Sequence, residues 1–158
     1  MKAKLSVKSK RDILLVTLLF IILGGIYILF RLFAFQGEAS IANVYYGTSN
    51  EPIVSIDFIN YRVIANYDQD VPSSYNQVYP IIDESANTIT LLGDYEIDGT
   101  RQIVVIQYNF GAKSVQIIQE QSPNNICSRE GVSTGWPLIC LPNRIRVEFE
   151  TNGEDFTI

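Results

Sequence analysis

The chain has 158 residues, with 12 Lys or Arg, 17 Asp or Glu and no histidine, and its formal net charge is −5. The absence of histidine excludes Ser-His-Asp and Cys-His catalytic sites and any zinc site with a histidine ligand, and two cysteines alone do not complete a structural zinc site. We therefore predict a protein that is not an enzyme, with no catalytic residues, no cofactor and no metal ligands.

The first segment in chain order is apolar. Residues 13–30 contain no charged side chain, and the apolar run resumes after Arg31 up to residue 35. At about 1.5 Å of rise per residue, residues 13–35 are long enough for a helix that crosses a hydrocarbon core of about 30 Å. Residues 1–12 carry five Lys or Arg against one Asp. Because positive residues stay on the cytoplasmic side, we predict a basic cytoplasmic tail (1–12), a single transmembrane helix (13–35) and an extracytoplasmic β-domain (36–158).

Two other roles fit the apolar segment less well. A cleaved signal peptide usually has an apolar region of about 7–15 residues, shorter than this one, but Gly37 and Ala39 have a spacing compatible with cleavage before Ser40. A buried core helix normally shows a polar stripe, and this segment is apolar all round. We favour a single-pass anchor in the cell membrane.

The domain after the apolar segment is acidic. Residues 32–158 contain six Lys or Arg against sixteen Asp or Glu, a net charge of −10. Nucleic-acid binding relies on a basic surface that releases counterions from phosphates, so we predict no nucleic-acid partner. Asp94, Glu96 and Asp98 alternate along one stretch, which we interpret as a solvated acidic edge and not as a calcium site.

Alternating apolar and polar residues predict a series of β-strands in this domain. Asp98 and Gly99 are expected to form a tight turn, and residues 68–77 an exposed loop. No segment outside 13–35 has helical periodicity, so we predict an all-β fold, a small β-barrel or sandwich of about seven short strands preceded by one transmembrane helix. Strands are expected over residues 40–46, 53–58, 61–67, 78–82, 87–93, 101–110, 114–120 and 143–150.

Residues 122–149 contain both cysteines, the single tryptophan and three of the six prolines. Twelve residues separate Cys127 from Cys140, and an extracytoplasmic compartment allows disulfides to persist. We expect a disulfide, with two buried unpaired thiols or a redox-active pair as alternatives. The spacing is wider than that of a thioredoxin-like C-x-x-C motif, which disfavours the redox-active pair.

Four residues of this segment are candidates for contact with a partner: Arg129, Trp136, Pro142 and Asn143. Trp136 is either an exposed recognition aromatic or a side chain packed over the cysteine pair, and we favour packing. The loop 127–140 is therefore the expected contact region, and a membrane or envelope protein is the expected partner.

The residues around the cysteines resemble the pattern of a known family. Pro123 and Cys127 fit its Cys-Pro-x-x-x-Cys segment, Gly131 fits the glycine-containing turn that follows, and residues 139–143 fit its Val-Cys-Leu-Pro-Asn segment. On these residues the chain resembles the NusG domain II-like family, small β-domains often found as membrane-anchored proteins of Gram-positive bacteria.

The resemblance covers about residues 40–60 and 95–150 and leaves the segment between them as an insertion. It implies a compact β-barrel or sandwich. Ser122 stands where the family pattern has its first cysteine, so chemistry that needs three cysteines does not carry over. Related anchored proteins are encoded among redox and vitamin-transport genes, which implies extracytoplasmic electron transfer or envelope assembly.

Two functions fit the sequence. The first is a non-catalytic, membrane-anchored extracytoplasmic β-domain that serves as a binding or accessory module of an envelope protein complex. The second is an accessory component of extracytoplasmic redox, electron-transfer or transport machinery that uses Cys127 and Cys140 reversibly. We favour the first, because the cysteine spacing gives little support to redox chemistry.

Overall fold

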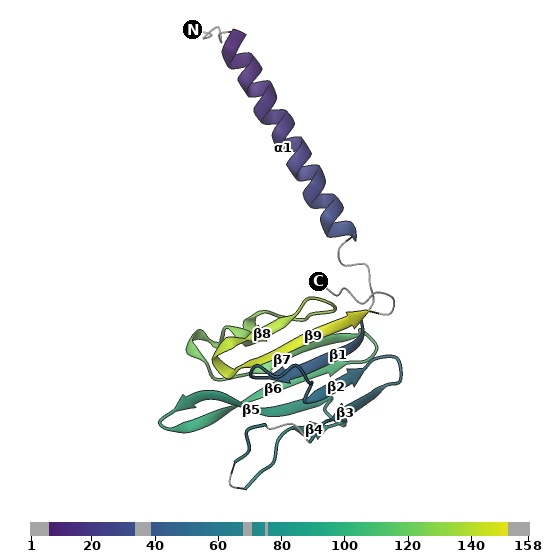
Figure 1. Ribbon diagram of the computed structural model, residues 1–158, viewed down its shortest axis with the longest axis vertical. Coiled ribbons are helices and arrows are strands. Elements are labelled where there is room, and N and C mark those ends of the chain that lie inside the picture. Colours follow the sequence, from purple (N-terminus) through teal and green to yellow (C-terminus); the bar gives the residue numbers. More distant parts are fainter. Residues whose placement is uncertain (1–6, 34–38, 68–70, 75, 152–158) are drawn as a thin grey trace. The chain divides into compact units, whose positions relative to one another are not determined.

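The structure is a computed structural model that describes residues 7–33, 39–67, 71–74 and 76–151 (Figure 1). The chain divides into two compact units, Met1–Gln36 and Gly37–Ile158. Several predictions fall on residues outside the described ones. These are the first half of the basic tail, the end of the transmembrane helix at 34–35, and part of the exposed loop at 68–70 and 75.

The first unit contains one helix, α1 (Val7–Phe33). Its stretch Arg11–Leu29 has a mean hydropathy of 2.6 and is long and apolar enough to cross a membrane. The hydroxyl of Thr17, a polar group within that stretch, donates a hydrogen bond of 2.8 Å to the carbonyl of Ile13, so its polarity is satisfied inside the helix. α1 begins within the predicted basic tail, because the edge of an apolar segment does not mark the end of a helix.

The second unit consists of two antiparallel sheets. The first sheet has the strand order β3-β2-β1-β9-β8, with β1 (Ala39–Tyr46), β2 (Val54–Asp57), β3 (Arg62–Ala65), β8 (Leu138–Cys140) and β9 (Ile145–Thr151). The second sheet has the order β4-β5-β6-β7, with β4 (Ile81–Asp83), β5 (Thr88–Ile97), β6 (Thr100–Asn109) and β7 (Ser114–Gln119). Three short 3-10 helices lie around β8: η1 (Pro123–Asn125), η2 (Cys127–Arg129) and η3 (Leu141–Asn143).

Both sheets contribute side chains to one buried apolar cluster. The alternation along β6 shows how the sequence produces it, because Ile106 and Tyr108 are buried while Gln107 and Asn109 are exposed. Burial of this apolar surface is the main term that stabilises the second unit. The cluster includes Ala42, Val44, Val54, Ile56, Ile145 and Val147 from the five-stranded sheet, and Ile89, Leu91, Val104, Ile106, Val115 and Ile117 from the four-stranded sheet.

The structure confirms a β-rich unit preceded by one apolar helix, and each predicted strand overlaps an observed one. One strand was missed: β8 has three residues, too few for an alternating pattern to be recognised. The segment 60–95, which the family resemblance left as an insertion, supplies β3, β4 and most of β5. That segment therefore forms part of both sheets.

The hairpin of β5 and β6 contains the predicted turn. Asp98 and Gly99 have φ values of 52° and 75°, the left-handed region that Asp-Gly turns adopt. The pairing between the two strands shifts between Leu92 and Glu96. Gly93 lies in this irregular part, and a Cβ atom added to it would lie 2.0 Å from the amide oxygen of Asn143. Only a glycine allows β5 to approach η3 this closely.

We expect Gly93→Ala to lower the free energy of unfolding by about 1–3 kcal/mol, because the added methyl group overlaps a buried side chain. Thermal or urea unfolding of the full chain in detergent, followed by circular dichroism, measures the effect. Gly135→Ala is the matched control, since no atom lies within 4 Å of its Cβ position. Equal melting temperatures for the two variants would contradict the close contact.

Asp57 fixes the turn between β2 and β3. Its carboxylate accepts hydrogen bonds from the backbone N–H groups of Ile59 and Asn60 at 3.1 and 3.0 Å, from the side-chain amide of Asn60 at 2.7 Å and from Nε of Arg62 at 3.2 Å. These bonds, above all those from Asn60, lower the pKa of Asp57 from 3.8 to about 2. The ionised carboxylate therefore stabilises the folded state.

The contribution of Asp57 to stability is expected to be complete above its ordinary pKa and to disappear as the pH falls from about 4 towards about 2. Asp57→Asn removes the ionisable group. Urea unfolding of both proteins at about pH 6 and about pH 2.5 should show a stability difference that shrinks at the lower pH. A difference that does not change with pH would show that the depressed pKa is absent.

Candidate functional site

Cys127 and Cys140 form the expected disulfide. Cys127 begins η2, Cys140 ends β8, and their Cα atoms are 5.2 Å apart. Both residues are buried in the apolar cluster, and neither cysteine of the chain is free. The disulfide therefore joins the edge strand of one sheet to a loop that follows the other sheet.

The loop closed by the disulfide is also held at its centre. The backbone N–H and carbonyl groups of Ser133 exchange hydrogen bonds of 2.8 Å with those of Val115 in β7. The hydroxyl of Ser133 donates to the carbonyl of Trp136 and accepts from the N–H of Gly135 at 3.3 Å. Because Ser133 is fully buried, water does not compete for these hydrogen bonds. They fix the loop against β7.

Two buried polar side chains, Asn143 and Glu120, lie next to the disulfide. Asn143 is 0 % exposed; its amide nitrogen donates to Sγ of Cys140 at 3.3 Å, and its amide oxygen accepts from the N–H of Tyr95 at 3.3 Å. Glu120 is 4 % exposed, and its Oε1 accepts a hydrogen bond of 3.2 Å from the N–H of Cys127. Each cysteine thus has a buried polar neighbour.

Glu120 is the functional candidate that sequence reasoning missed. One carboxylate oxygen of Glu120 and the two Sγ atoms all lie within 4.8 Å of one another. Among the described residues, no donor reaches Oε2 of Glu120, and the buried hydroxyl of Ser122 also has no partner. No local signal pointed to it: alternation along β7 places Glu120 on the outward face with Gln116 and Ile118, and acidic residues are rarely buried.

The predicted contact residues fall into two groups. Arg129, Trp136 and Pro142 are exposed, as a contact role requires. Trp136 is 43 % exposed, more than packing over the cysteine pair predicts. Asn143 lies in the interior, where it cannot reach a partner, so the contact role assigned to it is corrected to a structural one. Its buried amide instead forms hydrogen bonds with the N–H of Tyr95 and with Sγ of Cys140.

Exposed apolar side chains of the second unit gather in two stretches of the sequence, residues 59–67 and 126–141, and the second stretch contains the disulfide loop. Twelve large hydrophobic residues of the second unit are exposed among the described residues, and five of them lie within 126–141. Alternation accounts for Ile139, because it points outward between the buried Leu138 and Cys140 of β8. We call the set the apolar loop surface; it comprises Ile126, Val132, Trp136, Ile139 and Leu141.

The acidic edge predicted at 94–98 is only partly solvated. Glu96 and Asp98 are exposed, but Asp94 accepts hydrogen bonds from Tyr46 and Arg101 and forms a salt bridge of 3.2 Å with Arg144. Asp94 therefore connects β5 with β1 and with the residue before β9, and the expectation for this carboxylate is corrected.

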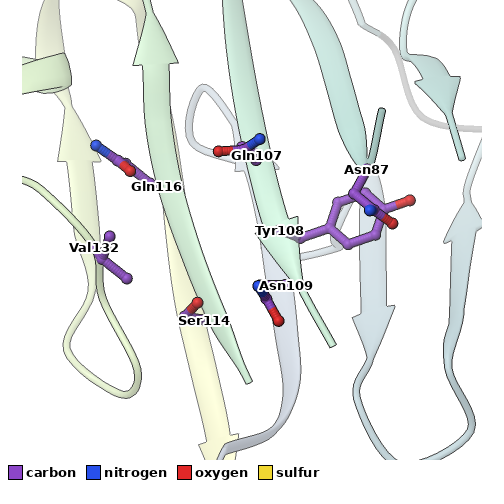
Figure 2. A pocket seen from close by; sticks show the side chains of 7 residues that line it. All are labelled: Asn87, Gln107, Tyr108, Asn109, Ser114, Gln116 and Val132. Carbon is purple, nitrogen blue, oxygen red and sulfur yellow. The ribbon is translucent and has the colours of Figure 1, made fainter. Parts of the chain in front are cut away.

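Figure 2 shows a pocket on β6 and β7 that extends to the disulfide loop. The pocket has a volume of about 220 Å³, and strand pairing sets Gln107 beside Gln116 and Asn109 beside Ser114. Its amide and hydroxyl groups offer hydrogen bonds to neutral ligands, and its lining holds no charged side chain and no nucleophile with a base. The complete lining is Asn87, Gln107, Tyr108, Asn109, Ser114, Gln116 and Val132.

No protein-family model, curated protein or solved structure matches this chain. The function of the second unit must therefore be argued from its own residues. Its distinctive features are the disulfide, the buried carboxylate beside it and the exposed apolar side chains of residues 126–141. The disulfide is sensitive to reduction, and the exposed apolar side chains are suited to a protein contact. The pocket on β6 and β7 offers neither property.

We expect Cys127→Ser to lower the free energy of unfolding by about 3 kcal/mol, because the disulfide closes a short loop and limits the unfolded chain. Chemical unfolding of the full chain without reductant measures the loss. The wild-type protein in excess phosphine reductant is the matched comparison and should be destabilised by a similar amount. Unchanged stability of both would mean that the disulfide does not constrain this loop.

Proposed function

We propose that this protein is a non-catalytic, membrane-anchored extracytoplasmic β-domain that binds an envelope protein partner through the apolar loop surface. The observation that carries this proposal is the concentration of exposed apolar side chains on a loop fixed by a disulfide. Exposed apolar side chains that lie close together on a domain surface are typical of protein contact sites, and the five of the apolar loop surface lie within residues 126–141.

The anchor and its orientation are part of the proposal. α1 has the length and hydropathy for a single membrane span, and the basic residues of 1–12 favour a cytoplasmic N-terminus. The disulfide supports an extracytoplasmic position for the second unit, because disulfides are rare in the reducing cytoplasm. The resemblance to the membrane-anchored proteins of the NusG domain II-like family agrees with the same arrangement.

We further infer that the two sheets form a β-sandwich. The five-stranded sheet ends at β3 and β8 and the four-stranded sheet at β4 and β7, without a strand shared between them. Both contribute to one buried cluster, which supports two layers packed face to face. In such a fold the apolar loop surface lies at the β8 edge of one layer.

The composition of the loop fits a protein partner. Trp136 and Arg129 are residue types that frequently dominate binding energy, and exposed charged groups such as Glu130 and Arg144 supply a polar rim. The disulfide and the buried hydrogen bonds of Ser133 hold the loop before binding, which reduces the entropy that is lost when a partner binds. A catalytic role has no comparable support among the described residues.

Site-specific photo-crosslinking in native membranes tests the contact. A photoreactive residue at position 139 is expected to crosslink to a discrete partner, and one at position 64, on the exposed Ile64 of β3, is the matched control. Adding Trp136→Ala should reduce the yield from position 139 about tenfold, as loss of an aromatic hot spot does. Equal crosslinking from 64 and 139, or no effect of the tryptophan change, would contradict the proposal.

A redox accessory role is the second candidate, and the position of Glu120 beside the disulfide favours it. A buried carboxylate next to sulfur can influence thiol–disulfide exchange, which depends on the charge around the thiolate. Cys127→Ser separates the candidates. If the protein is a binding module, the variant should lose stability but keep its crosslinks at a temperature at which it stays folded. If the protein is a redox accessory, the variant should lose thiol–disulfide exchange activity at every temperature.

A further inference from the structure

We propose that reduction of the disulfide creates a zinc site in which Cys127, Cys140 and Glu120 are the three protein ligands. The inference does not depend on partner binding, because its residues are buried and the apolar loop surface is exposed. It concerns a second state of the same chain, since the sulfur atoms cannot bind zinc while they are bonded to each other.

The three side chains lie close enough to share one ion once the bond between the sulfur atoms is broken. The two Sγ atoms and one carboxylate oxygen lie within 4.8 Å of one another. With Zn–S bonds of about 2.3 Å and Zn–O bonds of about 2.1 Å, ligand atoms of a tetrahedral site are separated by roughly 3.5–3.8 Å. Once the bond between the sulfur atoms is broken, repulsion moves them apart towards this spacing, and Glu120 is already in reach.

The buried carboxylate points to a cation. Glu120 is buried, no donor among the described residues reaches its Oε2, and none of their Lys or Arg side chains pairs with it. Among the same residues its Oε1 accepts only the N–H of Cys127, and a buried carboxylate with a single neutral donor is costly. A divalent ion bound between this group and two thiolates compensates the charge.

The donor set selects zinc among common divalent ions. Two thiolates and one carboxylate suit a borderline-soft ion, whereas magnesium and calcium require oxygen ligands only. Three protein ligands leave a fourth tetrahedral position for water, as in zinc sites that are not purely structural. The acidic charge of residues 32–158 also favours the approach of cations.

The two states are connected by balanced steps. A dithiol donates two electrons and two protons, so that the bond between Cys127 and Cys140 breaks into two thiols while the dithiol becomes a disulfide. Zinc then replaces the two thiol protons, which are released to solvent. Oxidation by a disulfide reverses the sequence and expels the ion. Metal occupancy thus depends on the redox state of the compartment.

Metal titration of the full chain in detergent tests this site. Protein reduced by a phosphine is expected to bind one Zn²⁺ per chain, and oxidised protein none at the same concentration. Co²⁺, used as a spectroscopic probe, should give thiolate-to-cobalt charge-transfer absorption and the visible bands of a tetrahedral ion in the reduced protein alone. Equal metal uptake by reduced and oxidised protein would overturn the proposal, because it would assign binding to the acidic surface.

Two variants identify the ligands. Glu120→Gln should weaken Zn²⁺ binding of the reduced chain by more than about tenfold. Loss of a group that only hydrogen-bonds to a metal ligand already weakens binding by about tenfold, and loss of a ligand should cost at least as much. Glu130→Gln, which changes an exposed carboxylate three residues after Cys127, is the matched control and should leave affinity unchanged. Cys140→Ser should remove most charge-transfer absorption.

Thermal unfolding of each variant distinguishes a lost ligand from a lost fold. If the reduced variants keep the melting temperature of the reduced wild-type chain, the differences in affinity belong to the site. Equal Zn²⁺ affinity of Glu120→Gln and Glu130→Gln would show that Glu120 is not a ligand and would overturn the assignment. Crosslinking from position 139 is unaffected by either result, so the two proposals fail separately.

Discussion

The close approach of Gly93 in β5 to Asn143 in η3 is the constraint on which the arrangement around the disulfide depends. Asn143 reaches Tyr95 of β5 with its oxygen and Cys140 with its nitrogen, so one buried amide links the four-stranded sheet to the disulfide. From Cys127 the connection continues to Glu120, directly after β7. The disulfide segment, whose β8 belongs to the five-stranded sheet, is thereby attached to the other sheet at β5 and at the end of β7.

A charged cluster makes a second connection between the sheets. Asp94 of β5 binds Tyr46 of β1, Arg101 of β6 and Arg144 before β9, and Arg101 also donates to the carbonyl of Gly93 at 2.9 Å. These groups are partly exposed, so water screens their attraction and each pair contributes only about 1 kcal/mol or less. Their geometric effect is greater, because they determine which part of β5 faces β1.

The sequence predicted the strands because their alternation is a local property. It did not predict β8, which is three residues long, and it did not predict which polar residues are buried. Asn143 and Asp94 have partners 48 residues away along the chain, and no local pattern shows such pairing. The partner of Glu120 is only seven residues away, but the burial of Glu120 breaks the alternation of β7. The outward position of Ile139 follows from the alternation of β8, a strand that the sequence did not predict.

The buried carboxylate distinguishes two requirements on this loop. Oε1 of Glu120 satisfies the buried N–H of Cys127, but Oε2 has lost its hydration and gained no partner among the described residues. The disulfide already constrains the loop, the bonds of Ser133 fix its centre, and the hydrogen bond from Cys127 uses only one of the two oxygens of Glu120. Its position within reach of both sulfur atoms is instead suited to chemistry at the sulfurs. The proposed contact surface and the proposed metal site can therefore lie on one segment, because exposed and buried side chains alternate along it.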